Sequence, residues 1–144
     1  ITITDNGCGI PPEMLAKVTD PYTTSRTTRK VGLGIPLFKQ NAERTGGQLT
    51  LESEVGKGTV LTAVFVRSNI DRPILGDIAG VVVILVSANP KIDFVYSHSV
   101  NSNCYVFDTR EVREALDGLP LNEPSVIPLL KEMIASNLEE LQIG

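Results

Sequence analysis

Two short stretches of the sequence carry residues whose types and spacing suit contact with a ligand. In "DNGCG", Asp5 follows a short run of alternating apolar and polar residues, and Gly7 and Gly9 flank a cysteine. In "GLG", Gly32 and Gly34 stand two positions apart. A carboxylate accepts hydrogen bonds, and glycines let the backbone come close to a bound group. Taken singly, each stretch has a simpler interpretation, which is a turn or a strand-end residue that caps the next helix.

The sequence between these stretches is polar and basic. It reads "DPYTTSRTTRK" (20–30) and carries Arg26, Arg29 and Lys30. Irregular connections of this length are usually functional in compact domains. The basic side chains are placed to meet phosphate charge, and a solvated basic loop is the alternative interpretation for each of them.

The surrounding pattern predicts the elements that hold these residues. Alternation in "ITIT" (1–4) predicts a strand with one buried face. One helix is expected to begin at Pro11-Pro12, and another lies within residues 31–47, where Gly46-Gly47 would end it. "QLTLESE" and "TVLTAVFV" on either side of "VGKG" predict a β-hairpin.

Composition excludes several classes of protein. The 144 residues are 42% hydrophobic and 21% charged, which is typical of a soluble globular protein. A net charge of −4 argues against general nucleic-acid binding. Two cysteines are too few for a disulfide framework, so we expect the protein in the reducing cytoplasm. The longest apolar run, 81–86, is too short to span a membrane. The sequence has no initiator methionine and begins within a strand pattern, so we expect a piece of a longer protein.

Charge divides the chain into two segments. Residues 1–67 carry eight basic and six acidic side chains, a net of +2, whereas residues 68–144 carry five and eleven, a net of −6. The change falls at "SNIDRPILGD", which is typical of a linker. We therefore expect a domain over 1–67, a linker over 68–79 and an α/β extension over 80–144.

The second segment matches no functional pattern. "GVVVILVSANP" (80–90) predicts a buried strand, and residues 93–100 and 103–108 predict two strands of a hairpin. Helices are expected from Asp108 to Gly118 and from Ser125 onward, the last one packed on a sheet face. This segment either extends the core or forms a docking or regulatory surface.

The order of the motifs in residues 1 to about 67 resembles the nucleotide-binding domain of the histidine-kinase-like ATPase family. That family includes sensor histidine kinases, gyrase-type ATPases, Hsp90 chaperones and mismatch-repair ATPases. The acidic corner is followed by Asp20-Pro21-Tyr22, by G-L-G, by Gly-Gly and by the hairpin "SEVGKGT" (53–59), an order most similar to the sensor kinases. The resemblance implies an α/β (α+β) two-layer sandwich with a mixed, mostly antiparallel sheet and helices on one face. This is a Bergerat-type ATP-binding fold lacking its first part.

The resemblance also implies how ATP would bind. Asp5 would accept a hydrogen bond from the exocyclic amine of adenine, and Thr59 would help through its hydroxyl or a water. The G-L-G motif would present backbone N–H groups to the phosphates at a helix start, and the basic loop would be a lid. The implied nucleotide-binding residues are Asp5, Gly7, Gly9, Ile10, Tyr22, Thr23, Thr24, Arg26, Lys30, Gly32, Leu33, Gly34 and Thr59.

Other groups that the family uses are not found in this sequence. Its Mg²⁺-binding asparagine lies upstream of the acidic corner, so we identify no catalytic or metal-binding residue and expect this segment alone to bind nucleotide poorly and to be inactive. His98, the only histidine, is expected to be structural rather than a phospho-acceptor.

For the full-length protein we expect ATP- and Mg²⁺-dependent phosphoryl transfer to a protein side chain, as in a bacterial two-component sensor kinase. A homodimer is one expected assembly, and no contact with nucleic acid or membrane is expected from this segment. One alternative is an ATP-hydrolysing conformational switch of the gyrase or chaperone type. The other is a degenerate module that binds nucleotide or a partner protein.

Overall fold

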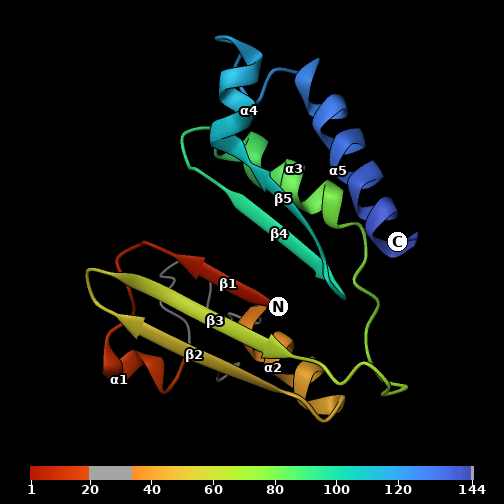
Figure 1. Ribbon diagram of the computed structural model, residues 1–144. Coiled ribbons are helices and arrows are strands. Elements are labelled where there is room, and N and C mark those ends of the chain that lie inside the picture. Colours follow the sequence, from red (N-terminus) through yellow and green to blue (C-terminus); the bar gives the residue numbers. More distant parts are fainter. Residues whose placement is uncertain (20–33, 144) are drawn as a thin grey trace. The chain divides into compact units, whose positions relative to one another are not determined.

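The computed structural model describes residues 1–19 and 34–143. The chain folds into two compact units, Ile1–Ile74 and Leu75–Gly144. Each unit has an antiparallel sheet and helices of its own (Figure 1). The predicted combination of antiparallel sheet and helices is therefore confirmed.

The first unit is built on a three-stranded sheet in the order β1–β3–β2. The strands are β1 (Thr2–Asp5), β2 (Gln48–Glu54) and β3 (Gly58–Val64). β2 and β3 form the predicted hairpin, and β1 pairs antiparallel with the other side of β3. The central strand is thus β3, and both the N-terminal strand and the hairpin are confirmed.

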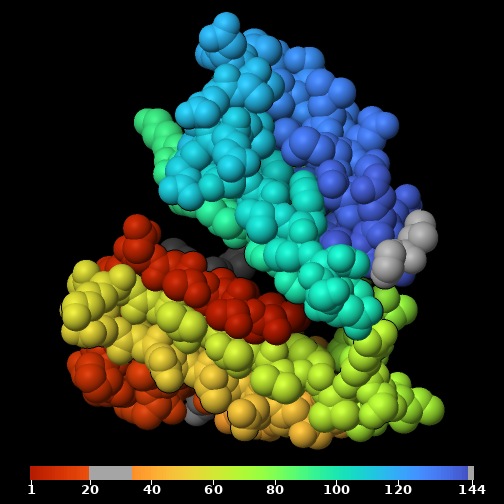
Figure 2. Space-filling view, viewed as in Figure 1, coloured from red at the N-terminus to blue at the C-terminus, as the bar shows by residue number. Residues whose placement is uncertain are grey.

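One face of this sheet is covered and the other is open. Leu61 and Ala63 of β3 are buried on the covered face, beneath α2 (Gly34–Arg44). Ile1 and Ile3, which we expected to be buried, lie on the same face of β1 but are 55% and 54% exposed. The reason is that α2 packs over β2 and β3, and the space-filling view shows β1 at the surface of its unit (Figure 2).

The first helix of this unit begins where the sequence predicts, and the second ends at the predicted glycines. α1 (Pro12–Leu15) follows Pro11 and has Glu13 in its first turn. α2 ends shortly before Gly46, whose φ of +85° only glycine adopts readily. The N–H of the next residue, Gly47, then donates to the carbonyl of Ala42 at 3.0 Å and closes the helix end.

The second unit joins a β-hairpin to three helices. Its elements are α3 (Ile78–Ala88), β4 (Val95–Val100), β5 (Asn103–Asp108), α4 (Thr109–Leu116) and α5 (Val126–Ile143). The hairpin and the last two helices were predicted, and α5 packs on α3 and on the β4–β5 sheet. Among the described residues, no helix has the length and apolar character needed to cross a membrane.

The prediction of a strand at 80–90 is wrong, because residues 80–88 belong to helix α3, which ends at Ala88. The Asp77 side chain caps this helix by accepting a hydrogen bond from the Gly80 N–H at 3.0 Å. The high valine content favoured a strand, but the spacing of the buried residues is i, i+3, i+4 and i+7, which is a helical face. Those residues are Ala79, Val82, Val83 and Val86.

Helix α4 begins and ends at the predicted residues. The Asp108 carboxylate binds the Arg110 guanidinium at 2.7 Å and accepts a hydrogen bond from the Arg110 backbone N–H at 2.9 Å. These bonds hold the pKa of Asp108 below its usual value. The helix ends at Asp117 and Gly118, which have φ values of +47° and +96°.

The core of the second unit yields a test of its packing. Ile134 of α5 is completely buried, whereas Leu129 on the same helix is 64% exposed. We predict that Ile134→Ala lowers the free energy of unfolding by about 2–5 kcal/mol, because it leaves a cavity. Leu129→Ala, a matched control, should change it by less than about 0.5 kcal/mol. Hydrogen exchange of peptides from residues 75–144 measures the change in the free energy of unfolding for both variants. Equal changes would contradict the assigned packing of α5.

Candidate functional site

Three polar side chains form a row across one end of the first sheet. Asp5 is the cross-strand partner of Thr59, and Thr59 is the partner of Ser53. Because cross-strand partners share a face and lie within about 4.5–5.5 Å at their Cβ atoms, these side chains are neighbours on the face that α2 covers. The next row on this face is apolar and consists of Ile3, Leu61 and Leu51.

This arrangement brings together Asp5 and Thr59, which the sequence assigned to one ligand. They lie far apart along the chain, and the β1–β3 ladder makes them direct neighbours. The result is a carboxylate and a hydroxyl at the border of an apolar surface. Such a surface suits a flat heterocycle that carries hydrogen-bonding groups on its edge.

The loop after β1 holds the Asp5 carboxylate in a fixed orientation. Its Oδ1 atom accepts a hydrogen bond from the Gly7 N–H at 2.9 Å. A Cβ at Gly7 would lie only 3.1 Å from that same oxygen, so a larger residue would crowd the carboxylate. The bond engages one carboxylate oxygen and thereby sets the direction of the other.

Two glycines let this loop and the hairpin come into close contact. A Cβ on Gly9 would lie 2.2 Å from the Glu54 carbonyl oxygen, and a Cβ on Gly58 would lie 2.0 Å from the Asp5 carbonyl oxygen. Their φ values of +76° and +128° also disfavour other residues. Since no side chain fits at either place, these glycines set the separation between the acidic corner and the β2–β3 turn.

Ser53 links all parts of the corner and was not among the predicted site residues. Its Oγ accepts from the Ile10 N–H at 2.7 Å, donates to the Gly58 carbonyl at 3.0 Å and lies 2.8 Å from the Thr59 Oγ1. The sequence held a signal for this role. The length of the hairpin turn sets the β2–β3 register, and that register places Ser53 opposite Thr59.

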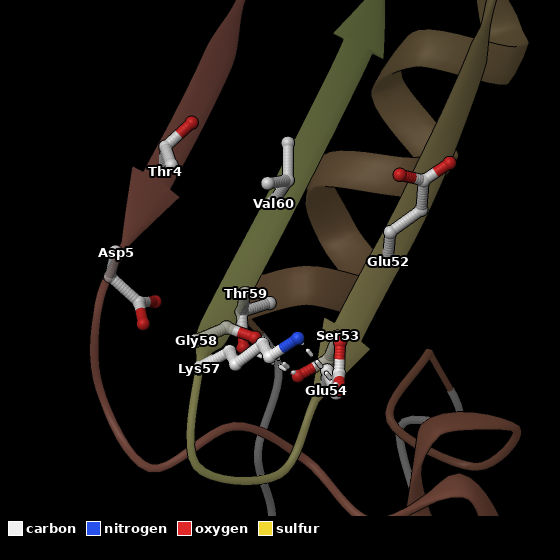
Figure 3. A pocket seen from close by; sticks show the side chains of 9 residues that line it. All are labelled: Thr4, Asp5, Glu52, Ser53, Glu54, Lys57, Gly58, Thr59 and Val60. Atoms are coloured by element: carbon white, nitrogen blue, oxygen red, sulfur yellow. Dashed lines mark hydrogen bonds and ion pairs between the residues drawn. The ribbon is translucent and has the colours of Figure 1, made fainter.

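A shallow pocket of about 360 Å³ lies at the same end of the sheet (Figure 3). Its lining includes all three side chains of the Asp5–Thr59–Ser53 row. It also includes Thr4, Val60 and Glu52, which share the opposite face of the sheet. None of the apolar row beside Asp5 lines it. The pocket therefore includes the polar row and continues around the strand ends to the opposite face, without extending over the apolar row. The exposed Lys57–Glu54 pair at its rim, 3.2 Å apart, adds little stability.

The other predicted site residues fall into two groups. Ile10 lies beside the corner through its bond to Ser53. Gly34 is the first residue of α2, and no atom of the described residues, beyond its neighbours along the chain, lies within 4 Å of a Cβ built on it. The rest lie outside the described residues, namely Tyr22, Thr23, Thr24, Arg26, Lys30, Gly32 and Leu33.

The reactive side chains of the second unit have structural partners. His98 lies on β4, where its Nδ1 is 2.9 Å from the Tyr96 hydroxyl, and burial raises the pKa of that tyrosine. Hydrogen bonds from Ser97 and Ser99 lower the pKa of the exposed Cys104 thiol. Within the part of the chain that the structure describes, no group of three or more His, Cys, Asp or Glu side chains could hold a metal ion.

Comparison with known proteins gives a family match for the first unit. Residues 1–69 match the family described as "Histidine kinase-, DNA gyrase B-, and HSP90-like ATPase". The first unit belongs to this family. The acidic corner, the helix start at Gly34 and the β2–β3 hairpin of this histidine kinase-like ATPase unit all lie inside the matched range.

Several relatives of the ATPase unit are sensor kinases. A probable C4-dicarboxylate sensor kinase of Bacillus subtilis is 37% identical over 65 residues, 45% of this chain and 12% of that protein. The sensor histidine kinase ZraS of Salmonella typhimurium is 39% identical over 62 residues, 43% of this chain and 13% of that protein. A putative sensor protein of Shewanella frigidimarina is 32% identical over 49% of this chain and 11% of its own length. The chain thus spans only about an eighth of these relatives.

The contact at Gly58 yields a second test. We predict that Gly58→Ala destabilises the ATPase unit by at least about 1 kcal/mol more than Gly56→Ala, because the added methyl overlaps the backbone of Asp5. Gly56 is a matched control, since it also has a positive φ, +84°, but no atom of the described residues, beyond its neighbours along the chain, lies within 4 Å of its Cβ position. Urea unfolding followed by hydrogen exchange in residues 1–19 and 34–69 compares the two. Equal losses would show that the corner does not pack against the hairpin as described.

Proposed function

We propose that the first unit binds ATP and that Asp5 and Thr59 contact the edge of its adenine base. The ring would lie against Ile3, the exposed end of the apolar row that continues to Leu61 and Leu51, next to the two polar side chains. The observation that carries the proposal is the cross-strand pairing of Asp5 with Thr59 on the helix-covered face. The family match over residues 1–69 supports the choice of ATP.

The phosphates would lie toward the start of α2. This helix has 11 residues and begins at Gly34, so its N-terminal N–H groups can bind an anion. From the sequence, Gly32 would add a further backbone donor, and Arg26 and Lys30 would neutralise phosphate charge as part of a closing loop. Tyr22, Thr23, Thr24 and Leu33 complete the contacts that we propose for this side of the nucleotide.

We further propose that the whole protein transfers the γ-phosphoryl group of ATP to a protein side chain. The support is the set of sensor kinases among the relatives. In such a reaction the nucleophile of the acceptor replaces the ADP oxygen on phosphorus, and the protein contributes positioning and charge neutralisation. The setting that fits is a cytoplasmic two-component pathway with a separate phospho-acceptor. A homodimer and the absence of nucleic-acid and membrane contacts from these residues belong to the same proposal.

Magnesium would accompany ATP in that reaction and neutralise charge on its phosphates. The described residues contain no cluster of side chains suited to a metal ion. We therefore assign no metal ligand within them and derive no step through the metal. What these residues would do is bind the base and present the phosphates.

The adenine contact yields a third prediction. Asp5→Asn keeps an oxygen that can accept from the Gly7 N–H, so the local turn should survive. It removes the charge and turns an amide NH₂ toward the ligand's amine. We predict a loss of ATP affinity of about 1.5–3 kcal/mol, tenfold or more, with little change in stability. Calorimetric titration of the full-length protein measures this. Asp71→Asn, the same change at an exposed position of the first unit, is the control, and equal affinities of all three proteins would remove Asp5 from the site.

A fourth prediction concerns the reaction. Incubation of the whole protein and its acceptor with γ-labelled ATP and Mg²⁺ should place label on protein, and Asp5→Asn should reduce it at subsaturating ATP. Release of labelled phosphate without labelled protein would contradict transfer and favour a hydrolysing switch. ATP binding with neither product would instead favour a binding module.

A further inference from the structure

We propose that Ser53 fixes the direction of the Thr59 hydroxyl proton, so that Thr59 can only accept hydrogen bonds from a nucleotide base. Ser53 is then a positioning residue that determines base specificity through Thr59. The inference rests on the proposed ATP site and identifies the part of that site that distinguishes adenine from other purines.

The starting point is the set of three hydrogen bonds at one serine oxygen. The Ile10 N–H points at Ser53 Oγ from 2.7 Å, the Gly58 carbonyl oxygen lies 3.0 Å away, and Thr59 Oγ1 lies 2.8 Å away. All three contacts are partly buried, so water is a poor substitute for any of them.

Counting protons at this oxygen assigns each role. A serine hydroxyl has one proton to donate and two lone pairs that accept. The amide of Ile10 can only donate, so it occupies one lone pair. The carbonyl of Gly58 can only accept, so it takes the single proton. The contact with Thr59 must therefore use the second lone pair of Ser53, and Thr59 must be the donor.

The consequence lies at Thr59. Its only hydroxyl proton points at Ser53, away from the neighbour on its other side, which is Asp5. The Thr59 oxygen then offers only lone pairs to a ligand. Asp5, ionised, is also a pure acceptor. The two residues together form a pair of acceptors beside the apolar row.

A pair of acceptors suits an exocyclic amine and disfavours a carbonyl. The 6-amino group of adenine has two hydrogens, and in the proposed site it donates one to Asp5 and the other directly to Thr59. Hypoxanthine and guanine carry an oxygen at this position, which would face two acceptors without a proton between them. An ordinary threonine could rotate its hydroxyl and donate to that oxygen. Ser53 prevents this rotation by holding the proton.

Ser53 acts through Thr59 because of where it lies. In the register of the sheet Thr59 stands between Ser53 and Asp5, so Ser53 is one strand further from the acidic corner. A structural role alone would affect every nucleotide equally. A role in proton placement changes the ratio of affinities for ATP and inosine triphosphate, and this ratio is the decisive measurement.

The experiment is a double-mutant cycle on that ratio. Affinities for ATP and inosine triphosphate are measured calorimetrically for the wild-type protein, Ser53→Ala, Thr59→Val and the double variant. We expect Ser53→Ala to lower the ATP preference about three- to tenfold, the effect of one hydrogen bond, because the freed Thr59 hydroxyl can donate to the inosine oxygen. In the Thr59→Val background the same substitution should leave the ratio unchanged, because no hydroxyl remains to be oriented.

Two controls keep the result interpretable. Ser53→Thr retains the hydroxyl and should keep the wild-type ratio even if it alters stability. Thr50→Ala removes an exposed hydroxyl from the same strand, on the opposite face, and should leave the ratio unchanged. The inference is wrong if Ser53→Ala leaves the ratio of ATP to inosine triphosphate affinities unchanged, or if it changes this ratio equally in the wild-type and Thr59→Val backgrounds. Either result leaves the proposed ATP site unaffected. Wild-type protein that binds no ATP, or Asp5→Asn that binds it normally, overturns the proposed function and the inference with it.

Discussion

The pairing of β1 with β3 is the constraint on which the rest of the first unit depends. A hairpin alone is marginally stable, and a third strand gives it the area needed to hold a helix against one face. The same pairing carries the acidic corner to the hairpin end, where Gly9 and Gly58 allow backbone to touch backbone. The same strand pairing therefore forms both the sheet and the candidate site of this unit. The four-residue strand β1 contributes little buried area itself, since its isoleucine, Ile3, and Ile1 just before it are both more than half exposed.

The second unit is held together in a different way. Its two-stranded sheet is too small to form a core alone, and the buried residues come mostly from α3 and α5. Val86 and Ile134, which are almost wholly buried, belong to these two helices, and Phe107 of β5 joins them. The hairpin thus serves as a platform for helices rather than as the centre of the unit. The reactive side chains of the hairpin form hydrogen bonds with neighbouring side chains of the same sheet, as His98 does with Tyr96.

Local signals in the sequence predicted most of the elements, and they failed where tertiary packing decides. The turn chemistry of "VGKG" and Asn101–Asn103 and the caps at Asp108 and Gly46 act within a few residues, so they could be identified from the sequence. The valine-rich run at 80–90 gave opposing signals, β-propensity for a strand and i, i+3, i+4 spacing for a helix, and burial against α5 favoured the helix. Asp5 and Thr59 were predicted as a pair from a family resemblance. For Ser53, the turn length indicates the register that places it opposite Thr59, but the count of hydroxyl protons requires the hydrogen bonds of the structure.

The fixed register of the hairpin also limits how this sequence can change in length. Side chains in a strand alternate with a period of two, so adding or deleting one residue between Glu54 and Gly58 would shift the pairing and turn one strand's side chains to the wrong face. The buried Leu61 and Ala63 would then exchange places with polar neighbours, and Thr59 would leave the row that contains Asp5. The irregular segment between Val64 and Ile78 carries no such ladder. We therefore expect insertions and deletions among related sequences to occur in the segment between Val64 and Ile78, and not in the β2–β3 turn.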